Sequence, residues 1–450
     1  MQLASTQAFN LYHNTISSHT SYLNYSISTM PLTPSQIDIV KSTAPVLKVH
    51  GETITSLFYK NLIGTYPQLR NIFNLSHQND GAQAKALAGA VLAYATHIDN
   101  PQVLLPTIEL IAQRHVSLGV SEDQYALVGE QLIKAIGQVL GDALTDDIAD
   151  AWTAAYGQLA GIFIDREKQL YQEAGEWDGW RKFKISKREK EADYITSFYL
   201  VPSDGNAPLP EVRPSQYVSL RISVAGLGGI FQCRQYSMSK APNGDYYRVS
   251  IKKESFTLEN KHEPLPGTVS NLLHNHYQVG DEVEMTYPRG EFWLDIEDAT
   301  KTDAPLVLIS AGVGVTPLMS MLESMLSSPR SKMTERPIVW LHAARNTKQM
   351  AFGEQIRILS QKNENVETVI FLKNVEPSDK KGEDYDIEGR LDLDVFRETK
   401  EEVLENDQAQ FFICGPAPWM VSTRDKLQNM GVAHDQINLE LFGTGSVNRE

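Results

Sequence analysis

Residues 104–118 read Leu104-Leu105-Pro106-Thr107-Ile108-Glu109-Leu110-Ile111-Ala112-Gln113-Arg114-His115-Val116-Ser117-Leu118. The apolar residues recur at helical spacing, and His115 falls on the same stripe as Ile108 and Ile111. A basic side chain on the buried face of a helix needs a polar partner. A haem iron would be such a partner, although a lone histidine on an apolar face is more often a satisfied core residue.

The same helical periodicity continues on both sides of this stretch, so we predict a packed all-α domain over residues 31–172. Thr33-Pro34-Ser35-Gln36 and Ser121-Glu122-Asp123-Gln124 are capping boxes, which mark helix starts. A last long helix is expected from about Asp146 to Tyr171.

Two polar side chains in this block are candidates for a ligand pocket. Tyr59 lies in the helical pattern of residues 55–62, and Gln83 shares an apolar stripe with Leu87. A hydroxyl and an amide facing a cavity across from His115 would supply hydrogen bonds to a ligand on iron. The alternative is a core tyrosine and a solvated glutamine.

Glu167 falls on the buried stripe of the last helix, where an unpaired carboxylate is costly. Tyr125 and His115 are its candidate donors. A carboxylate on the second imidazole nitrogen would fix the tautomer and make the ring a stronger donor to iron. The alternative is an exposed Glu167 paired with Arg166 or Lys168.

Residues 178–299 change to short alternating segments separated by turns, which predicts an antiparallel β-barrel. The segments are 194–201, 216–224, 246–252 and 282–287. Within this block, the stretch Arg234-Gln235-Tyr236-Ser237 places Arg234 and Tyr236 on one strand face. That face could bind a flavin cofactor, with Arg234 on its pyrophosphate and Tyr236 over its isoalloxazine ring. The loop from Gly267 enters a helix at Val269-Ser270-Asn271, where backbone amides would accept phosphate. An ordinary salt bridge and helix cap are the alternatives.

Residues 301–450 alternate apolar strands with helical stretches, which indicates an α/β domain with a parallel sheet. The expected strands are 305–311, 337–343, 366–372, 410–414 and 437–441. Gly312-Val313-Gly314-Val315-Thr316-Pro317 follows the first strand as a phosphate turn, but it lacks the third glycine of the Rossmann fingerprint. This departure favours a ferredoxin-reductase-like nicotinamide domain, with Cys414-Gly415-Pro416 in the same crevice. A buried thiol in the core is the alternative for Cys414.

The composition of the chain limits the kinds of partner it can bind. The net charge of −15 argues against nucleic acid and anionic membranes, and no apolar run is long enough for a transmembrane helix. Two distant cysteines, Cys233 and Cys414, suit a reducing compartment. Residues 1–30 contain no Lys, Arg, Asp or Glu, and we expect a disordered or targeting extension. We therefore expect a cytoplasmic protein, or a mitochondrial one if this segment is a transit peptide.

From about Met30 to Asn448 the chain resembles the flavohaemoglobins. The helical block looks like the globin domain of that family, and the matching residues are Phe58-Tyr59, Gln83, Leu87, Ala112-Gln113-Arg114-His115 and Ile164-Asp165-Arg166-Glu167. The resemblance implies a distal Tyr59 and Gln83, a proximal haem ligand at His115, and a pair formed by Tyr125 and Glu167 behind it.

The other two blocks look like the FAD and NAD(P)H domains of that family. The resemblance places Tyr217 at the adenine half of FAD and Phe442, in Leu441-Phe442-Gly443-Thr444, beside the flavin. Ser215 stands where a glycine is usual, and the end of the chain after Gly443 lacks the common family ending.

The activity that this resemblance implies is nitric oxide dioxygenase. Hydride would pass from NADH or NADPH to FAD and single electrons to haem b, and NO and O2 would be converted to nitrate. The alternatives are an NAD(P)H diaphorase or ferric reductase and a haem-based oxygen sensor or carrier. We expect a monomer. Coenzyme choice stays open: Arg345 after the second nicotinamide-domain strand could pair with a 2′-phosphate, but the sequence favours an ordinary exposed arginine.

Overall fold

The structure is a computed structural model, and it describes residues 31–73, 81–177, 179–256, 265–266, 268–296, 303–327 and 336–442. The predicted extension, residues 1–30, lies outside the described residues. The described chain divides into two units. One contains residues 31–180 and 221–234, and the other contains residues 181–220 and 235–442.

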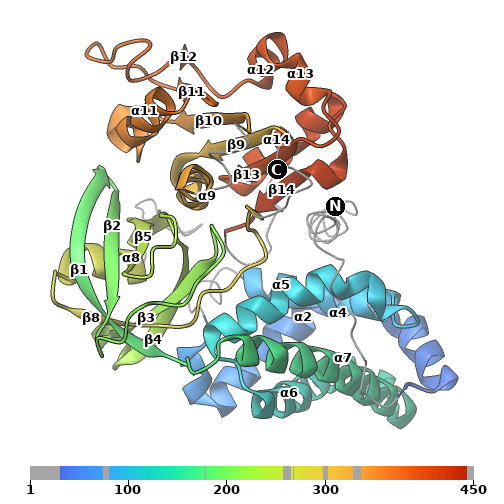
Figure 1. The fold of residues 1–450 in the computed structure, drawn as a ribbon. Helices are drawn as coiled ribbons and strands as arrows, with labels where there is room; N and C mark the ends of the chain where they lie inside the picture. The colour runs from blue at the N-terminus through green and yellow to red at the C-terminus, as the bar shows by residue number, and fades with distance from the viewer. Residues whose placement is uncertain are drawn as a thin grey trace. The chain divides into compact units, whose positions relative to one another are not determined.

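Helices form the first unit, as predicted (Figure 1). They are α2 (Pro34–Thr65), α4 (Ala82–Thr96), α5 (Leu105–Leu118), α6 (Glu122–Leu140) and α7 (Asp146–Glu173), with short 3₁₀ turns at Pro67–Asn71, Pro101–Leu104 and Gly141–Ala143. Both capping boxes are present. Thr33 and Gln36 exchange hydrogen bonds at the start of α2, and Ser121 and Gln124 do so at the start of α6.

Helix α2 packs against α4, α6 and α7, and α5 packs against α7. The core between them is apolar, because each helix turns one hydrophobic stripe inward. Its fully buried members include Ile54, Phe58, Leu62, Ala112, Ala135, Ala155 and Leu170.

An antiparallel sheet opens the next part of the chain, as predicted. Its strands are β1 (Arg181–Ala192), β2 (Ile195–Pro202), β3 (Tyr217–Val224), β4 (Ile230–Ser237), β5 (Tyr247–Lys252) and β8 (Glu282–Met285), in the order β4-β3-β8-β1-β2-β5. A bridge between Met238 and Val249 joins the end of β4 to β5, which closes the sheet toward a barrel. A two-stranded ribbon, β6 (Ser255–Phe256) and β7 (Leu265–Pro266), precedes helix α8 (Thr268–His276).

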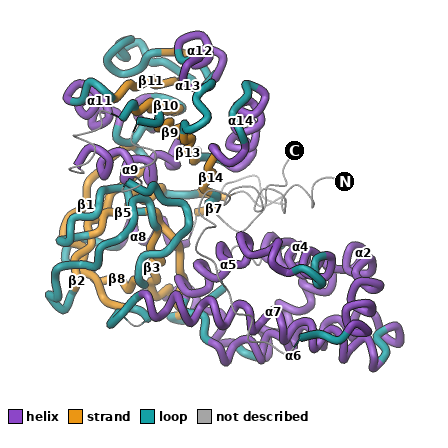
Figure 2. Tube along the Cα trace, turned by 45° about the vertical axis from the view of Figure 1, so that its right-hand side comes forward, coloured by secondary structure: helices purple, strands orange, loops and turns teal. Residues whose placement is uncertain are grey.

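A parallel sheet follows, with the order β12-β11-β10-β9-β13-β14. Its strands are β9 (Leu306–Ala311), β10 (Ile338–Ala344), β11 (Val366–Leu372), β12 (Ile387–Glu388), β13 (Gln410–Cys414) and β14 (Ile437–Glu440). Its helices are α9 (Val315–Ser327), α11 (Gly353–Lys362), α12 (Leu393–Thr399), α13 (Glu401–Leu404) and α14 (Ala417–Asn429), drawn as purple tube in Figure 2. All five expected strands are present. The order in which the strands are added to the sheet reverses between β9 and β13. Open α/β sheets bind their ligands at such a switch point.

One arrangement in the first unit was not predicted. Residues 221–234 group with the helices, although they belong in sequence to the antiparallel sheet. The amide of Phe231 donates to Asn71 Oδ1 at 2.8 Å, and Gln232 Nε2 donates to the carbonyl of Arg70 at 3.0 Å. The Arg221 guanidinium lies 4.4 Å from the ring centre of Trp180. Within the described part of the chain, no helix is long and apolar enough to cross a membrane.

Candidate functional site: a haem pocket and a reductase crevice

His115 lies near the end of α5, on the face that packs against α7. Its Nδ1 is 2.8 Å from Glu167 Oε1 and 3.0 Å from the Tyr125 hydroxyl. Tyr125 in turn donates to Glu167 Oε1 at 2.5 Å. The Glu167 side chain is only 4% exposed, so the exposed alternative for this residue is wrong. A buried carboxylate that accepts from Nδ1 leaves Nε2 as the nitrogen for a metal.

Burial holds the Tyr125 hydroxyl in its protonated form. Desolvation raises the pKa of Tyr125 well above its usual range, and the charge of Glu167 raises it further. Tyr125 therefore donates to the carboxylate at neutral pH and does not compete with it for the imidazole proton. The three side chains form one connected network, with Glu167 as its acceptor.

Residues that sequence reasoning did not single out hold this network in place. Tyr156 on α7 donates to the carbonyl of Tyr125 at 2.6 Å. Gly129 on α6 makes room for it, because a Cβ there would lie 2.5 Å from the Tyr156 ring. The only signal in the sequence was a glycine inside an otherwise regular helix.

One alternative paired Arg166 with Glu167, but Arg166 pairs with a different carboxylate. Its guanidinium makes a two-pronged ion pair with Glu109 of α5, with nitrogen to oxygen distances of 2.6 and 2.8 Å. Both side chains are largely buried. Helices α5 and α7 are thus tied together twice, by Arg166 with Glu109 and by Glu167 with His115.

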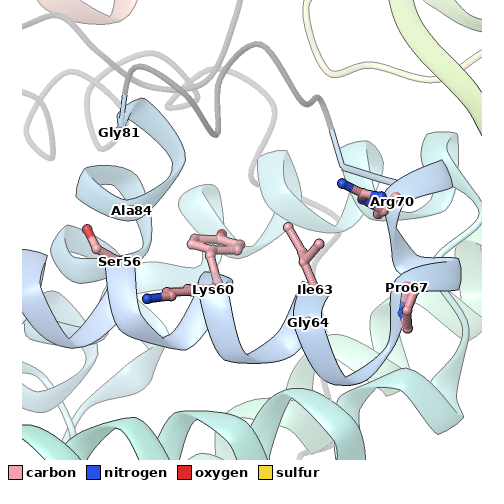
Figure 3. A pocket seen from close by; sticks show the side chains of 9 residues that line it. Ser56, Lys60, Ile63, Gly64, Pro67, Arg70, Gly81 and Ala84 are labelled. Carbon is pink, nitrogen blue, oxygen red and sulfur yellow. The ribbon is translucent and has the colours of Figure 1, made fainter. Parts of the chain in front are cut away.

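A cavity of about 570 Å³ lies along α2. Figure 3 shows one face of α2 bordering it, with Gly81 and Ala84 of the α4 region across from that face. The lining residues are Ser56, Tyr59, Lys60, Ile63, Gly64, Pro67, Arg70, Gly81 and Ala84. Its volume falls within the range of about 300–1,000 Å³ that small-molecule and cofactor sites occupy.

Tyr59 is the aromatic member of this wall. Its ring packs edge-on against Phe58 and Phe73, with centroid distances of 4.9 and 5.5 Å. Burial raises the pKa of Tyr59 well above its usual range, so the hydroxyl stays protonated. Gln83 is the second residue of α4, between Gly81 and Ala84, but it is not itself part of the cavity wall.

The kinds of residue present fit a haem, although His115 is not among the residues that line the cavity. The helical unit provides a histidine whose Nδ1 is already engaged and whose Nε2 makes no hydrogen bond to any residue the structure describes. It also provides a cavity with a protonated hydroxyl in its wall. A neutral imidazole held through Nδ1 is the usual proximal ligand of haem iron.

The predicted flavin strand is β4. Arg234 and Tyr236 are half-buried, Gln235 is exposed and Ser237 is buried, so burial does not alternate along this strand. Arg234 Nη1 donates to the carbonyl of its neighbour Cys233 at 2.7 Å. Residues two apart on a strand share a face, so Arg234 and Tyr236 lie on the same face of β4.

Tyr217 begins β3 and is held through its backbone. Its amide and carbonyl exchange hydrogen bonds of 2.8 Å with Arg289, and its ring packs on Gly290, where a Cβ would lie 3.0 Å away. Ser215, two residues earlier, has a φ of +74°, a conformation that favours glycine. The serine is tolerated because its hydroxyl donates to the carbonyl of Phe292 and its amide donates to Ser320 Oγ.

The predicted phosphate helix is α8, which begins at Thr268. Val269 and Ser270 are buried. Ser270 Oγ accepts from the amide of Glu254 at 3.1 Å, and Asn271 Nδ2 donates to the carbonyl of Glu254 at 2.7 Å. Both side chains thus fix the segment after β5 against the first turn of α8.

The predicted nicotinamide turn follows β9. Residues Gly312–Gly314 form a 3₁₀ turn that enters α9 at Val315, with Thr316 and Pro317 buried in its first turn. A Cβ on Gly314 would lie 2.2 Å from the carbonyl oxygen of Cys414, so only glycine fits there. A Cβ on Gly415 would lie 2.7 Å from the Trp419 ring, and Pro416 precedes α14. The two turns that were predicted to share a crevice therefore touch.

Cys414 is fully buried and pairs in register with Ser310 of β9. Burial raises the pKa of the Cys414 thiol, with a further contribution from Glu440. Leu441 and Phe442 follow β14, and the Phe442 side chain is 46% exposed. Gly443 and Thr444, also predicted as contacts, lie outside the described residues.

Two family models match the chain. The globin model matches residues 56–163, and the model of the oxidoreductase NAD-binding domain matches residues 308–425. A flavohemoprotein of Bordetella parapertussis is 46% identical over 421 residues, covering 92% of this chain and 100% of the relative. A flavohemoprotein of Rhizobium meliloti is 43% identical over 416 residues, covering 92% of this chain and 98% of the relative.

A solved structure agrees over the same length. The crystal structure of flavohemoglobin from Malassezia yamatoensis with bound FAD and heme has a TM-score of 0.78 and 27% identity, covering 92% of this chain and 100% of that chain. Fold and site together define a globin that continues into an FAD- and NAD(P)H-binding oxidoreductase. The chain belongs to the flavohemoproteins.

Proposed function

We propose that this chain is a nitric oxide dioxygenase that detoxifies NO. Two molecules each of NO and O2 and one NAD(P)H give two nitrate ions, one NAD(P)+ and one proton. The observation that carries the proposal is the Tyr59 hydroxyl, which stays protonated in a cavity wall of the same helical unit as the carboxylate-held His115.

Haem, when bound, supplies the centre at which oxygen is activated, and FAD divides the hydride of NAD(P)H into single electrons. His115 would hold the iron through Nε2. Glu167 accepts from Nδ1, which fixes the ring and increases its electron donation, and Tyr125 keeps the carboxylate in place.

Tyr59 would stabilise negative charge as it develops on oxygen in the cavity. A phenol whose pKa is raised by burial remains a donor at neutral pH. A fixed donor in a desolvated pocket stabilises such charge more strongly than water does, because it does not reorganise during the reaction. Gln83, beside the cavity wall, is proposed as a second donor.

The reductase part would bind its cofactors through the elements described above. On β3, β4 and α8 these are Tyr217, Arg234, Gln235, Tyr236, Ser237, Val269, Ser270 and Asn271 for FAD. We propose that residues 312–317 and 414–416 bind NAD(P)H. We propose that residues 441–444 lie beside the flavin. We further propose a cytoplasmic monomer without nucleic-acid or stable membrane partners, as the net charge of −15 favours.

The test is a product balance. The haem- and FAD-loaded full chain is given NO and NAD(P)H with and without O2, while NO loss, coenzyme oxidation and nitrate are measured together. The proposal predicts one nitrate per NO, half a coenzyme per nitrate, and no nitrate without O2. Rapid reduction of dyes or ferric iron without nitrate would establish a diaphorase instead, and reversible O2 binding without coenzyme oxidation would establish a carrier or sensor.

A further inference from the structure

Three cationic side chains follow three neighbouring strands of the parallel sheet. Arg345 comes directly after β10, Lys373 directly after β11, and Arg390 two residues after β12. The strands are in register at their ends, since Ala344 pairs with Leu372 and Leu372 pairs with Glu388.

Backbone hydrogen bonds extend this register beyond the strands. The Lys373 amide donates to the carbonyl of Ala344 at 3.0 Å, Asn374 donates to Arg345 at 2.9 Å, and Gly389 donates to Leu372 at 2.7 Å. Neighbouring strands lie about 4.8 Å apart. The three cations therefore follow three neighbouring strands at the carboxyl edge of the sheet, with Arg345 level with Lys373 and Arg390 one residue further along.

All three side chains are exposed, and none forms an ion pair within the part of the chain that the structure describes. Other cations nearby do have acidic partners. Lys348 pairs with Glu376 at 3.4 Å, and Arg357 pairs with Asp386 at 2.8 Å.

The acidic groups at this edge are mostly engaged elsewhere. Asp379 accepts from Thr347 Oγ1 and from the Glu376 amide, and Asp386 also accepts from the Ile370 amide. Glu388 is the exposed carboxylate that remains beside the cations. A chain with a net charge of −15 thus has three cations without ion-pair partners among the described residues at one edge, which favours an anionic ligand there.

The position of these cations relative to the nicotinamide turn identifies the anion. The turn at residues 312–314 follows β9, and β10 is the next strand on one side. In dinucleotide-binding sheets, a coenzyme whose pyrophosphate lies on the first turn brings its adenosine ribose to the end of the second strand. An acidic residue there binds the 2′-hydroxyl of NADH, whereas an arginine accommodates the 2′-phosphate of NADPH. This chain has Arg345 at that place.

We propose that Arg345, Lys373 and Arg390 bind the 2′-phosphate of NADPH, so that the chain uses NADPH in preference to NADH. Arginine offers paired donors to phosphate oxygens, and lysine adds a point charge. The inference rests on the proposed function, because NADPH is proposed as the coenzyme of that reaction. The phosphate-binding step itself requires no turnover.

Adenosine 2′,5′-bisphosphate and 5′-AMP are the probes, because they differ only in the 2′-phosphate. Each is titrated by calorimetry into the full-length chain loaded with haem and FAD. One hydrogen bond to a charged group contributes about 1.5–3 kcal/mol, so we expect the bisphosphate to bind at least about tenfold more tightly. The difference should shrink as salt is raised. Equal binding of the two probes would overturn the inference.

The variants Arg345→Gln, Lys373→Gln and Arg390→Gln should each lower this ratio, and the triple variant should abolish it. The matched control is Lys362→Gln, which removes one exposed charge at the end of α11, before the amino end of β11. The control should keep the ratio of the wild type. A ratio that survives in the triple variant would overturn the inference, since the cations would then not hold the phosphate.

The two proposals fail in different ways. Fast nitrate formation with NADH and slow formation with NADPH would overturn the coenzyme inference and leave the dioxygenase in place. Preferred binding of the bisphosphate without nitrate formation would overturn the dioxygenase and support the coenzyme inference. Arg345→Asp, which restores the acidic residue of NADH-binding sheets, should shift the coenzyme preference toward NADH.

Discussion

Glu167 Oε1 lies 2.8 Å from His115 Nδ1, on a side chain that is only 4% exposed. The distance joins a residue of α7 to a residue of α5 across a sequence separation of 52. It gives the histidine a fixed tautomer and ring orientation before any metal is bound.

Replacing Glu167 should weaken electron donation from His115. Glu167→Gln keeps the shape of the side chain but removes the charge, so the iron–histidine stretching frequency of the ferrous protein should fall in resonance Raman spectra. Tyr125→Phe, which leaves the carboxylate, should shift it less. Activity should drop about tenfold or more in Glu167→Gln, as is typical when a partner behind a metal ligand is lost. An unchanged frequency in that variant would show that the carboxylate does not act through the ring.

Ser215 permits a test of how this chain accommodates a left-handed residue. Ser215→Gly removes the conformational cost of φ +74°, about 1–2 kcal/mol, but also removes the bond to the Phe292 carbonyl, worth about 0.5–1.5 kcal/mol. Its unfolding free energy should therefore stay within about 1 kcal/mol of wild type. Ser215→Ala loses the bond and keeps the cost, so it should destabilise by about 0.5–1.5 kcal/mol in urea unfolding. Equal stability of the two variants would contradict this reasoning.

His342 should make the parallel sheet sensitive to acid. It is fully buried on β10, its Nδ1 lies 2.7 Å from Ser310 Oγ, and burial lowers its pKa from 6.5 to about 4. The unfolded chain therefore binds a proton at His342 between those values, and the folded chain does not. Stability is retained above about pH 6.5 and lost as the pH falls toward 4.

The comparison uses His342→Gln, which does not titrate. Relative to that variant, wild type should lose about 2–3 kcal/mol of unfolding free energy between about pH 7 and pH 4.5. Parallel pH profiles of the two proteins would show that the imidazole is not the cause.

Gly314 should tolerate no side chain. Gly314→Ala places a Cβ 2.2 Å from the Cys414 carbonyl, and overpacking of this kind costs about 1–3 kcal/mol. We expect weaker NAD(P)H binding by fluorescence titration with unchanged haem absorption. Gly157→Ala on α7, where the space is open, is the control and should change neither. Normal coenzyme affinity in Gly314→Ala would mean that the two turns can separate without loss.

Local patterns predicted the elements well because each element carries its own signal. The capping boxes at Thr33 and Ser121 and the alternation of β3 and β5 need no distant partner. Strand β1 was harder to predict from the sequence. Its buried Phe183 and Ile185 have a lysine between them, and mostly charged residues follow. His115 and Glu167 were found because a polar group on an apolar stripe signals a partner.

The missed features depend on residues that are distant in sequence. Nothing local joins Arg166 to Glu109 or Gln232 to Arg70. The roles of Ser270 and Asn271 in fixing Glu254 also follow from tertiary packing. Sequence periodicity gives the face of a helix on which a residue lies, but tertiary packing decides what that face meets.

The most direct measurement is the rate of NO consumption and nitrate formation by Tyr59→Phe, with Ser56→Ala on the same cavity wall as control. Both proteins are loaded with haem and FAD and assayed in air with saturating NADPH and NADH. We predict a fall of about 10²–10³-fold in Tyr59→Phe, as for loss of a fixed donor to developing charge, with dye reduction intact and Ser56→Ala near wild type. Wild-type nitrate formation in Tyr59→Phe would contradict the role given to the buried hydroxyl.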